Sequence, residues 1–265
     1  MEITTFELLV KRIAPPPAPA DIARRVVQGY FLTITNLEPR TITYRITFHI
    51  SRPNPFDADR TLFNNADLLI DIAGANSVIP LSGLLLSTTF RGTFQIPAKQ
   101  TASVQLLPKP SLFLPLNLNP FPDFEVRGFV NLTVPVINGS TQGTRPVRVL
   151  LNPEIRGTFL PNDAPFPNSA TRDFDQINYP LQLASGKGLN EILPNQLIII
   201  PVNKIGETLN SEEFQSSLAD VDELEKSQSL LQLMDQVNKD PKNVENLNNV
   251  LTQLDLPVRV SPIEV

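Results

Sequence analysis

The sequence contains no cysteine, no tryptophan and a single histidine, His49. The lack of cysteine excludes disulfide bonds, a thiolate nucleophile and any cysteine-ligated zinc or iron–sulfur centre. One histidine per chain argues against a multi-histidine metal site and against a histidine-based catalytic triad. With so little of this chemistry present, we predict that the protein uses no metal and no cofactor.

Long apolar runs are also missing. The run QLIIIPV at residues 196–202 is far shorter than the ~18–20 apolar residues of a membrane-spanning helix. The N-terminus, MEITTFELLVKRI, starts acidic and has a short apolar patch, whereas a secretory signal starts basic and has a longer apolar stretch. We therefore expect a soluble, cytoplasmic protein without a membrane span. Export by a route that needs no such signal stays open.

Proline and phenylalanine are plentiful instead. The chain has 26 prolines and 15 phenylalanines, and an apolar fraction of 41% against 18% charged residues is enough to build a core. Most prolines stand between apolar runs, where the missing N–H group and the fixed φ angle end a strand. Five of them fall from Pro108 to Pro122, so we predict an irregular, proline-rich loop there.

Alternation of apolar and polar residues is clearest around residues 30–50. Apolar side chains recur at every second position from Ile42 to Ile50, with threonine, arginine and histidine between them. This period of two is typical of a β-strand with one buried and one exposed face. A similar strand precedes it, and the segment NLEPR at 36–40 has turn residues. We therefore predict that the two strands pair as an antiparallel hairpin.

The same pattern repeats along residues 1–206, and short strands at intervals of about 8–15 residues with no helix between them are typical of a β-sandwich. The strand at 124–137 is predicted to pair with the one at 144–161 across the turn NGSTQG. We predict a mainly β body, an antiparallel β-sandwich of immunoglobulin-like or jelly-roll-like type. The segments GYFLTITNLEPRTITYRITF and IPAKQTASVQLLP resemble strand–turn–strand pieces of immunoglobulin-like bacterial sandwiches. The resemblance implies the fold class and no site residues.

The remaining residues, 207–265, differ in charge and in period. Residues 207–240 hold nine acids and two lysines, a net charge of −7, whereas residues 1–206 carry +3. Apolar residues of the acidic part recur at steps of three and four, which is typical of an amphipathic helix. We predict two helices, over 211–238 and 241–254, followed by an extended end. The first presents an apolar stripe to a partner surface, formed by Phe214, Leu218, Val221, Leu224, Leu231 and Met234.

An Arg-Gly step occurs three times in alternating stretches, at Arg91, Arg127 and Arg156. Apolar residues stand two positions before and after each glycine, so glycine falls on the inward side and arginine on the outward side. An inward glycine marks a bend, a bulge or the close approach of a backbone or a ring. If the three strands are neighbours in the sheet, the three arginines form a ladder on its outer face. On this hypothesis the ladder binds an anion or the acidic segment of another subunit. The alternative, which we favour, is that they are solvated strand residues.

Paired acids are further candidates for a site. They occur at three places: Asp57/Asp59, Asp67/Asp71 and Asp173/Asp175. Two carboxylates can hold calcium or act as acid and base. None of these pairs lies in an Asp-x-Asp-x-Asp-Gly loop, so we predict no metal site at them. His49 falls on the polar side of its strand, and we expect it to be an ordinary surface residue.

No nucleophile with a base partner can be identified, so we predict that the protein is not an enzyme. The favoured hypothesis is a structural or interaction protein that binds protein, in particular a second copy of itself, through its sheet edges and residues 207–265. The alternative is a ligand-binding β-sandwich for carbohydrate or another polymer, which the lack of tryptophan disfavours. Nucleic acid is not expected, because lysine and arginine form no clusters. Three phenylalanines in or beside the proline-rich loop offer a contact patch or cap the core: Phe113, Phe121 and Phe124.

Overall fold

The computed structural model describes residues 1–14, 17, 24–113, 123–137, 139–160, 175–201, 231, 244–253 and 258–261. The prediction of a mainly β chain with antiparallel pairing is confirmed. The strands are β1 (Glu2–Arg12), β2 (Arg25–Asn36), β3 (Ile42–Ile50), β4 (Ala66–Ile72), β5 (Ala75–Ile79), β6 (Thr89–Ile96), β7 (Thr101–Pro108), β8 (Phe124–Thr133), β9 (Val147–Leu160), β10 (Gln176–Pro180), β11 (Leu189–Ile192), β12 (Ile198–Pro201) and β13 (Val258–Ser261). They are accompanied by the short 3-10 helices η1 (Ala58–Arg60) and η2 (Pro110–Leu112) and by helix α4 (Val244–Gln253).

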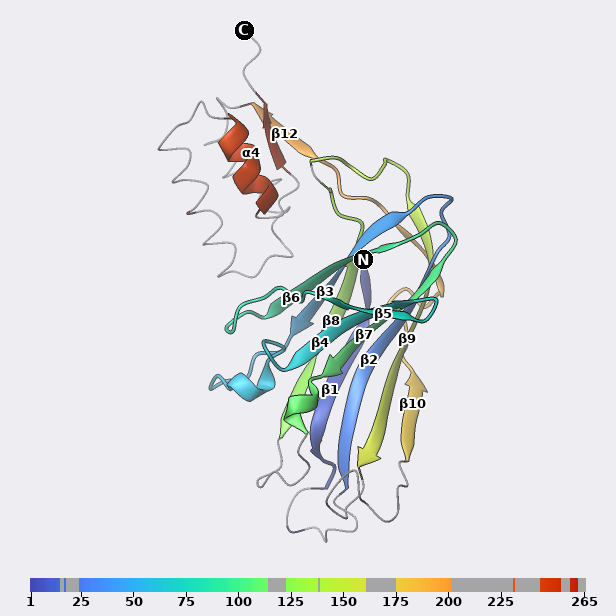
Figure 1. Cartoon of the computed structure of the whole chain (residues 1–265), viewed down its shortest axis with the longest axis vertical. Helices are drawn as coiled ribbons and strands as arrows, with labels where there is room; N and C mark the ends of the chain where they lie inside the picture. Colours follow the sequence, from blue (N-terminus) through green and yellow to red (C-terminus); the bar gives the residue numbers. More distant parts are fainter. Residues whose placement is uncertain are drawn as a thin grey trace.

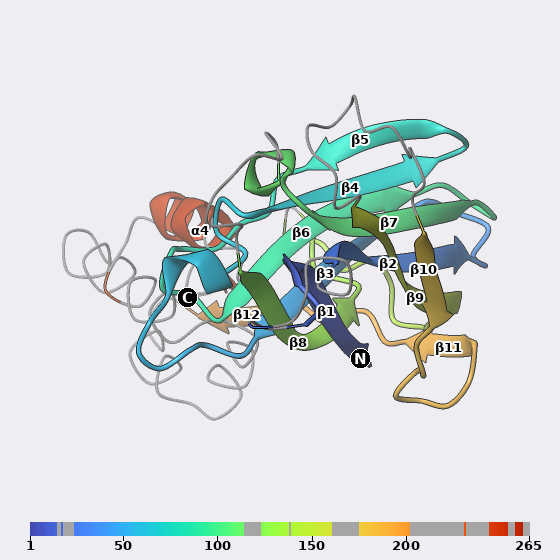
Figure 2. The same ribbon diagram turned by 90° about the horizontal axis from the view of Figure 1, so that it is seen from below.

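Strands β1 to β11 form one continuous sheet. Its main order is β5-β4-β7-β2-β1-β8-β3-β6, and β9 pairs with β2, β10 and β11. The sheet curls until β6, at one end of this order, comes close to β4 and β5 at the other, as Figures 1 and 2 show. At this closure Gly92 of β6 has no side chain, and a Cβ atom there would lie 2.2 Å from Leu68 Cδ2 of β4. The sheet is therefore nearly closed as a barrel.

Strand β2 belongs to two parts of this sheet. One of its edges pairs with β9 along the whole strand. The other edge pairs first with β1, over residues 25–28, and then with β7, over residues 30–35. Gly29 stands at the switch, where a Cβ atom would lie 2.6 Å from Leu107 Cδ2 and 3.1 Å from Leu106 O. Glycine therefore allows β7 to approach β2 at the point where β1 turns away.

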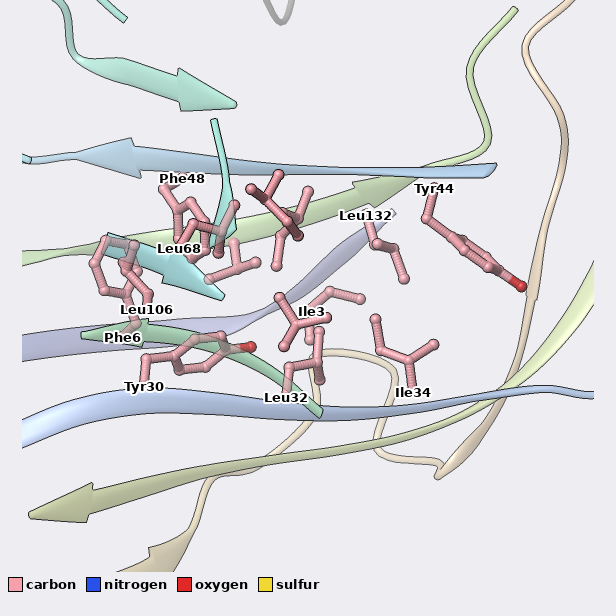
Figure 3. Packing of buried hydrophobic residues seen from close by; sticks show 14 of the residues in the cluster. Ile3, Phe6, Tyr30, Leu32, Ile34, Tyr44, Phe48, Leu68, Leu106 and Leu132 are labelled. Carbon is pink, nitrogen blue, oxygen red and sulfur yellow. The ribbon is translucent and has the colours of Figure 1, made fainter. Parts of the chain in front are cut away.

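The core lies between the inward faces of the curled sheet. Alternate residues of nearly every strand are buried in it, as the period of two requires. The rings of Phe6, Tyr30 and Phe48 pack together in it, with centroids 5.4 to 6.2 Å apart (Figure 3). Each such side chain stabilises the fold by about 1.5–3 kcal/mol through burial.

Residues 181–184, which follow β10, cross from β9 to β1. The Leu181 N–H donates to Pro153 O at 2.9 Å, and the Ala184 N–H donates to Ile3 O at 2.7 Å. The crossing lies beside the part of β1 that β2 has left. The crossing therefore links the β9 side of the sheet to β1 a second time, in addition to the link through β2. We call the line between β10 and β1 the seam.

The predicted hairpin around residues 36–40 is wrong. Strand β2 pairs with β1, β7 and β9, and β3 pairs with β6 and β8, so the two strands lie in different parts of the described sheet. The turn residues do reverse the chain, but the reversal carries it across the core. The fully buried Asn36 side chain holds this crossing, because its Nδ2 donates to Arg40 O at 2.9 Å and to Ile96 O at 3.0 Å.

The second predicted hairpin is wrong for the same reason. Strand β8 pairs with β1 and β3, whereas β9 pairs with β2, β10 and β11. The connection between them also crosses the core. Gln142 holds it to β3, since its Oε1 accepts from the Thr43 N–H at 2.8 Å and its Nε2 donates to Thr43 O at 2.9 Å.

Near the C-terminus, β12 pairs in parallel with β13, and α4 precedes β13 (Figure 1). Helix α4 falls within the range predicted for the second helix, and its Leu247 and Leu251 are buried. Asn248 links it to β13, since its Nδ2 donates to Val260 O and its Oδ1 accepts from the Val260 N–H. The first predicted helix, 211–238, lies outside the described residues except for Leu231. None of the helices in the described ranges is long and apolar enough to cross a membrane.

Candidate functional site

A hollow of about 630 Å³ lies on the outer side of β2, β4, β7, β9 and β10. Apolar residues of these strands line it, together with Phe113, which follows η2. We call this hollow the apolar groove and define it by Val27, Phe31, Leu69, Leu107, Phe113 and Ile177.

The alternation of the strands places these side chains on the outside. On β4 and β7 the side chains of Leu68 and Leu106 are buried in the core, so their neighbours Leu69 and Leu107 face outward. Gly29 lies opposite Leu107 on β2 and leaves the space into which that side chain leans. The floor of the apolar groove is therefore formed at the same residue where β2 switches partners.

The charges beside the apolar groove are paired. The Arg156 guanidinium lies 4.7 Å from the centroid of the Phe31 ring and forms an ion pair with Glu154. Lys109 Nζ lies 3.8 Å from Asp67 Oδ1. Because these charges already have partners and the floor is apolar, the groove is suited to the apolar side chains of a partner and not to a free ion.

A second hollow, of about 520 Å³, lies at the seam between β1 and β10. Thr5 of β1, Phe129 of β8 and Tyr179 of β10 line it. A neighbouring hollow of about 470 Å³ shares Thr5 and Phe129 and continues to Gln182. We call the two together the seam groove. Its walls carry aromatic rings, hydroxyls and charges, whereas the apolar groove is mostly aliphatic.

A cluster of charges borders the seam groove. Arg127 forms ion pairs with Glu7 and Glu125, and Lys11 also pairs with Glu125. Burial raises the pKa of Glu125, but its hydrogen bond to Lys11 and the positive charges around it outweigh burial and hold that pKa below its ordinary value. The hydrogen bond and the charge of Glu7 raise the pKa of Arg127. Glu125 and Arg127 are therefore both charged at neutral pH.

Two exposed aromatic residues line the seam groove, Phe129 and Tyr179. Phe129 is 43% exposed, and one side of its ring stacks on His49, with centroids 4.5 Å apart and ring planes at 11°. Strand β8 lies between β3, which carries His49, and β1, so the other side of the Phe129 ring faces Thr5 and the groove. Burial, and then the charge of Glu7, raise the pKa of Tyr179, so its hydroxyl stays protonated at neutral pH.

The three predicted arginines lie on β6, β8 and β9. Strand β3 separates β6 from β8, and β1 and β2 separate β8 from β9, so the predicted ladder on neighbouring strands is wrong. The arginines are instead distributed over the surface. Arg127 lies at the seam groove, Arg156 at the apolar groove and Arg91 in β6, whose backbone bridges to Ser82. Their role in binding a partner stays a prediction.

The glycines beside these arginines sit where neighbouring groups approach closely. A Cβ atom on Gly128 would lie 1.8 Å from His49 O, and one on Gly157 would lie 2.7 Å from Val27 O. Gly92 faces the core, where Leu68 occupies the space of its missing side chain. The prediction that these glycines mark close approach of a backbone or a side chain is therefore confirmed.

Of the six residues predicted for the apolar stripe, Phe214, Leu218, Val221, Leu224 and Met234 lie outside the described residues. Leu231 is described, is helical and is 67% exposed. Among the predicted phenylalanines, Phe113 lines the apolar groove, Phe124 is buried in the core, and Phe121 lies outside the described residues.

Several of the paired acids have partners among the described residues. Asp57 Oδ1 caps η1 by accepting from the Asp59 N–H at 3.0 Å, and Asp175 forms an ion pair with Arg24. Asp71 accepts from the Gly74 N–H at 2.8 Å. Asp173 lies outside the described residues. Within the described ranges, no group of three or more acidic, histidine or cysteine side chains converges on a point where a metal ion would bind.

Sequence reasoning missed the seam groove. Thr5, Phe129 and Tyr179 stand far apart along the chain, and each has an ordinary strand context. The one signal present was His49, which was predicted as a plain surface residue and in fact supports the Phe129 ring. No known family model matches the sequence, and no curated protein is similar to it.

Proposed function

We propose that this chain is a non-catalytic interaction protein that associates with a second copy of itself, and that the apolar groove is the contact surface. The observation that carries the proposal is the apolar groove itself, an outward hollow lined by half-buried aliphatic and aromatic side chains. Exposed apolar surface of this kind commonly marks a protein contact.

The edge of the sheet extends this surface. Strand β5 is at the end of the sheet order, and Val78 on it is 70% exposed. Val78 lies opposite Leu69 in the ladder, so its side chain continues the apolar row beyond the groove. A strand edge beside an apolar hollow offers both backbone hydrogen bonds and side-chain contacts to a partner.

The occupant we propose is the acidic segment 207–240 of the second copy. That segment carries a net charge of −7, and residues 1–206 carry +3, so the two parts attract each other. Its stripe of Phe214, Leu218, Val221 and Leu224 would supply apolar side chains in the spacing of one helix face. Such a helix needs a partner surface, because a short amphipathic helix is only marginally stable alone.

Two finer expectations belong to the same proposal. We propose that the curled sheet is a sandwich of immunoglobulin-like or jelly-roll-like type, which is supported by the connections that cross the core after β2 and after β8. We also propose that the protein acts in the cytoplasm. Fractionation of cells that express the tagged chain tests this location, and recovery of the chain outside the cytoplasmic fraction contradicts it.

Sedimentation velocity over a range of concentrations tests self-association of the full chain. The wild type is expected to form a dimer or a larger oligomer. Leu69→Asp places a charge in the apolar groove and is expected to weaken association at least about tenfold. The double variant Leu218→Asp/Leu224→Asp is expected to weaken it similarly, because it breaks the proposed stripe of the partner.

Leu193→Asp is the matched control, since Leu193 is 62% exposed and lies outside the apolar groove. It is expected to associate as the wild type does. Circular dichroism verifies that each variant keeps its β structure. A wild type that is monomeric at all concentrations, or a Leu69→Asp variant that associates as tightly as the wild type, contradicts the proposal.

A further inference from the structure

We infer that the seam groove is a binding site for a neutral oligosaccharide. This inference goes beyond self-association, because the seam groove and the apolar groove have no lining residue in common. The hollows of about 520 and 470 Å³ fall within the usual size range of small-ligand sites. Four features of the seam groove lead to this class of ligand.

The first feature is a fixed aromatic wall. The Phe129 ring is 43% exposed and stacks on His49 along one side, which limits its rotation and leaves its other side for a ligand. A pyranose ring has an apolar face of C–H groups that packs flat on such an aromatic ring. Tyr179, 40% exposed, also lines the groove and adds a protonated hydroxyl.

The second feature is a set of donors and acceptors beside this wall. The Arg127 Nε donates to Glu7 Oε1, and Glu7 Oε2 accepts from Gln28 Nε2 at 3.2 Å. These contacts hold a cationic donor and an anionic acceptor in fixed positions within one hollow. Sugar hydroxyls both donate and accept, so an adjacent donor and acceptor suits them, and hydrogen bonds to charged groups are the stronger ones.

The third feature is the balance of charge. The positive charge of Arg127 is compensated by Glu7 and Glu125, and Glu2 lines the neighbouring hollow. An anionic ligand would meet these carboxylates without a free cation to pair with in the described lining. The balance therefore favours a neutral sugar over a sulfated or sialylated one.

The fourth feature is length. The two hollows meet at Thr5 and Phe129, and the second continues past Gln182 and Leu183 along the seam. A ligand that stacks on Phe129 can therefore extend in both directions from that ring. An oligosaccharide occupies this shape, whereas a single sugar fills one of the hollows.

Calorimetric titration of the full chain with maltotetraose, cellotetraose, laminaritetraose and mannotetraose tests the inference, with sialyllactose as the anionic probe. At least one neutral tetrasaccharide is expected to bind. Phe129→Ala is expected to weaken that binding at least about tenfold, because it removes the stacking surface. Tyr179→Phe keeps the ring and removes the hydroxyl, and is expected to weaken it about fivefold.

Phe56→Ala is the matched control, because Phe56 is 38% exposed, has Arg52 over its ring and lies outside the seam groove. It is expected to bind as the wild type does. Thermal unfolding shows whether each variant is folded. If Phe129→Ala does not fold, Thr5→Val replaces it as the test variant, because valine has nearly the same volume as threonine. Absence of binding to all four neutral probes, preference for sialyllactose, or unchanged binding by folded Phe129 and Thr5 variants overturns the inference. The Leu69→Asp variant keeps sugar binding, which separates this result from self-association.

Discussion

The apolar groove and the seam groove are two hollows on the outside of one sheet, and they differ in chemistry while sharing their construction. Each contains glycine at a point where two paired strands approach closely, Gly157 in the first and Gly128 in the second. The walls differ because the lining residues are mostly aliphatic in one and aromatic and charged in the other. The buried positions specify the fold, whereas the lining residues set the chemistry of each groove.

The strongest test of this shared construction is the pair Gly128→Ala and Gly157→Ala. At Gly128 the new Cβ would lie 1.8 Å from a backbone oxygen of β3, and at Gly157 it would lie 2.7 Å from one of β2. We expect Gly128→Ala to lower the free energy of unfolding by about 3 kcal/mol and Gly157→Ala to lower it by about 1–2 kcal/mol. Urea unfolding measures both values.

Gly188→Ala is the control for the two glycine variants. The nearest atom to a Cβ at Gly188 is 3.8 Å away, which is ordinary contact, so the substitution is expected to change stability little. If Gly157→Ala lowers the free energy of unfolding more than Gly128→Ala does, the closest approach of two strands is not at Gly128 of the seam groove. That result would contradict the comparison of the two grooves.

Glu125→Gln tests whether the charge cluster sets the seam groove apart. The pKa of Glu125 is lowered in the folded protein, so its ion pairs stabilise the fold above its ordinary pKa of 4.5 and this contribution is lost as the pH falls through the lowered value. We expect the variant to be about 1.5 kcal/mol less stable at neutral pH, because Glu125 is mostly buried and has two cationic partners. The difference from the wild type is expected to shrink well below pH 4.5.

Urea unfolding of both proteins across this pH range measures the effect. Glu154→Gln, in the ion pair beside the apolar groove, is the companion variant and is expected to cost less, because Glu154 has one cationic partner and Arg156 is half exposed. A stability difference for Glu125→Gln that stays constant into acid would show that the charge of Glu125 is not what stabilises the seam.

Tyr30→Phe probes the core behind both grooves. The Tyr30 hydroxyl is fully buried and has no hydrogen-bond partner within the described part of the chain, and burial raises its pKa. Removing a buried hydroxyl without a partner is expected to raise the free energy of unfolding by about 1 kcal/mol. Thermal and urea unfolding measure the change. A loss of stability would mean that water from the seam groove, whose wall includes the adjacent Phe6, reaches this hydroxyl.

Arg156→Gln has the smallest expected effect. Its guanidinium lies over the Phe31 ring and pairs with Glu154, but the side chain is 48% exposed, so solvent weakens both contacts. We expect a loss of about 0.5 kcal/mol in the free energy of unfolding. Raising the salt concentration is expected to reduce this loss of stability. A loss several times larger would contradict the proposal that the apolar groove depends on apolar contacts and not on charge.

Alternation along the chain predicted most strands and which side chains face inward. Residues 42–50 form β3 with the expected buried positions, although Thr43 and Thr47 of the predicted exposed face are buried as well. The glycine of each Arg-Gly step lies where another group comes close. These features depend on local geometry, since side chains alternate by two residues in any strand. The mainly β, antiparallel character of the chain follows from the same local pattern.

Strand partners were not predictable in the same way. The residues at 36–40 reverse the chain, and a hairpin and a crossing of the core both begin with such a reversal. What stabilises the crossing is Asn36, whose buried amide at the end of β2 donates to Arg40 O, just before β3, and to Ile96 O of β6, the partner of β3. The seam groove escaped prediction for a similar reason, because Thr5, Phe129 and Tyr179 meet through the order of strands and through the crossing at 181–184.

The partner switch at Gly29 has a consequence for anyone who wishes to shorten the protein. Strand β2 hydrogen-bonds to β1, β7 and β9, and so it supports the walls of both hollows at once. A fragment of the chain that keeps one hollow must therefore keep β2. The fragment with the other hollow would then lack β2 and the hydrogen bonds that β2 makes to its neighbouring strands. The two surfaces must be engineered, inherited and lost as parts of a single unit.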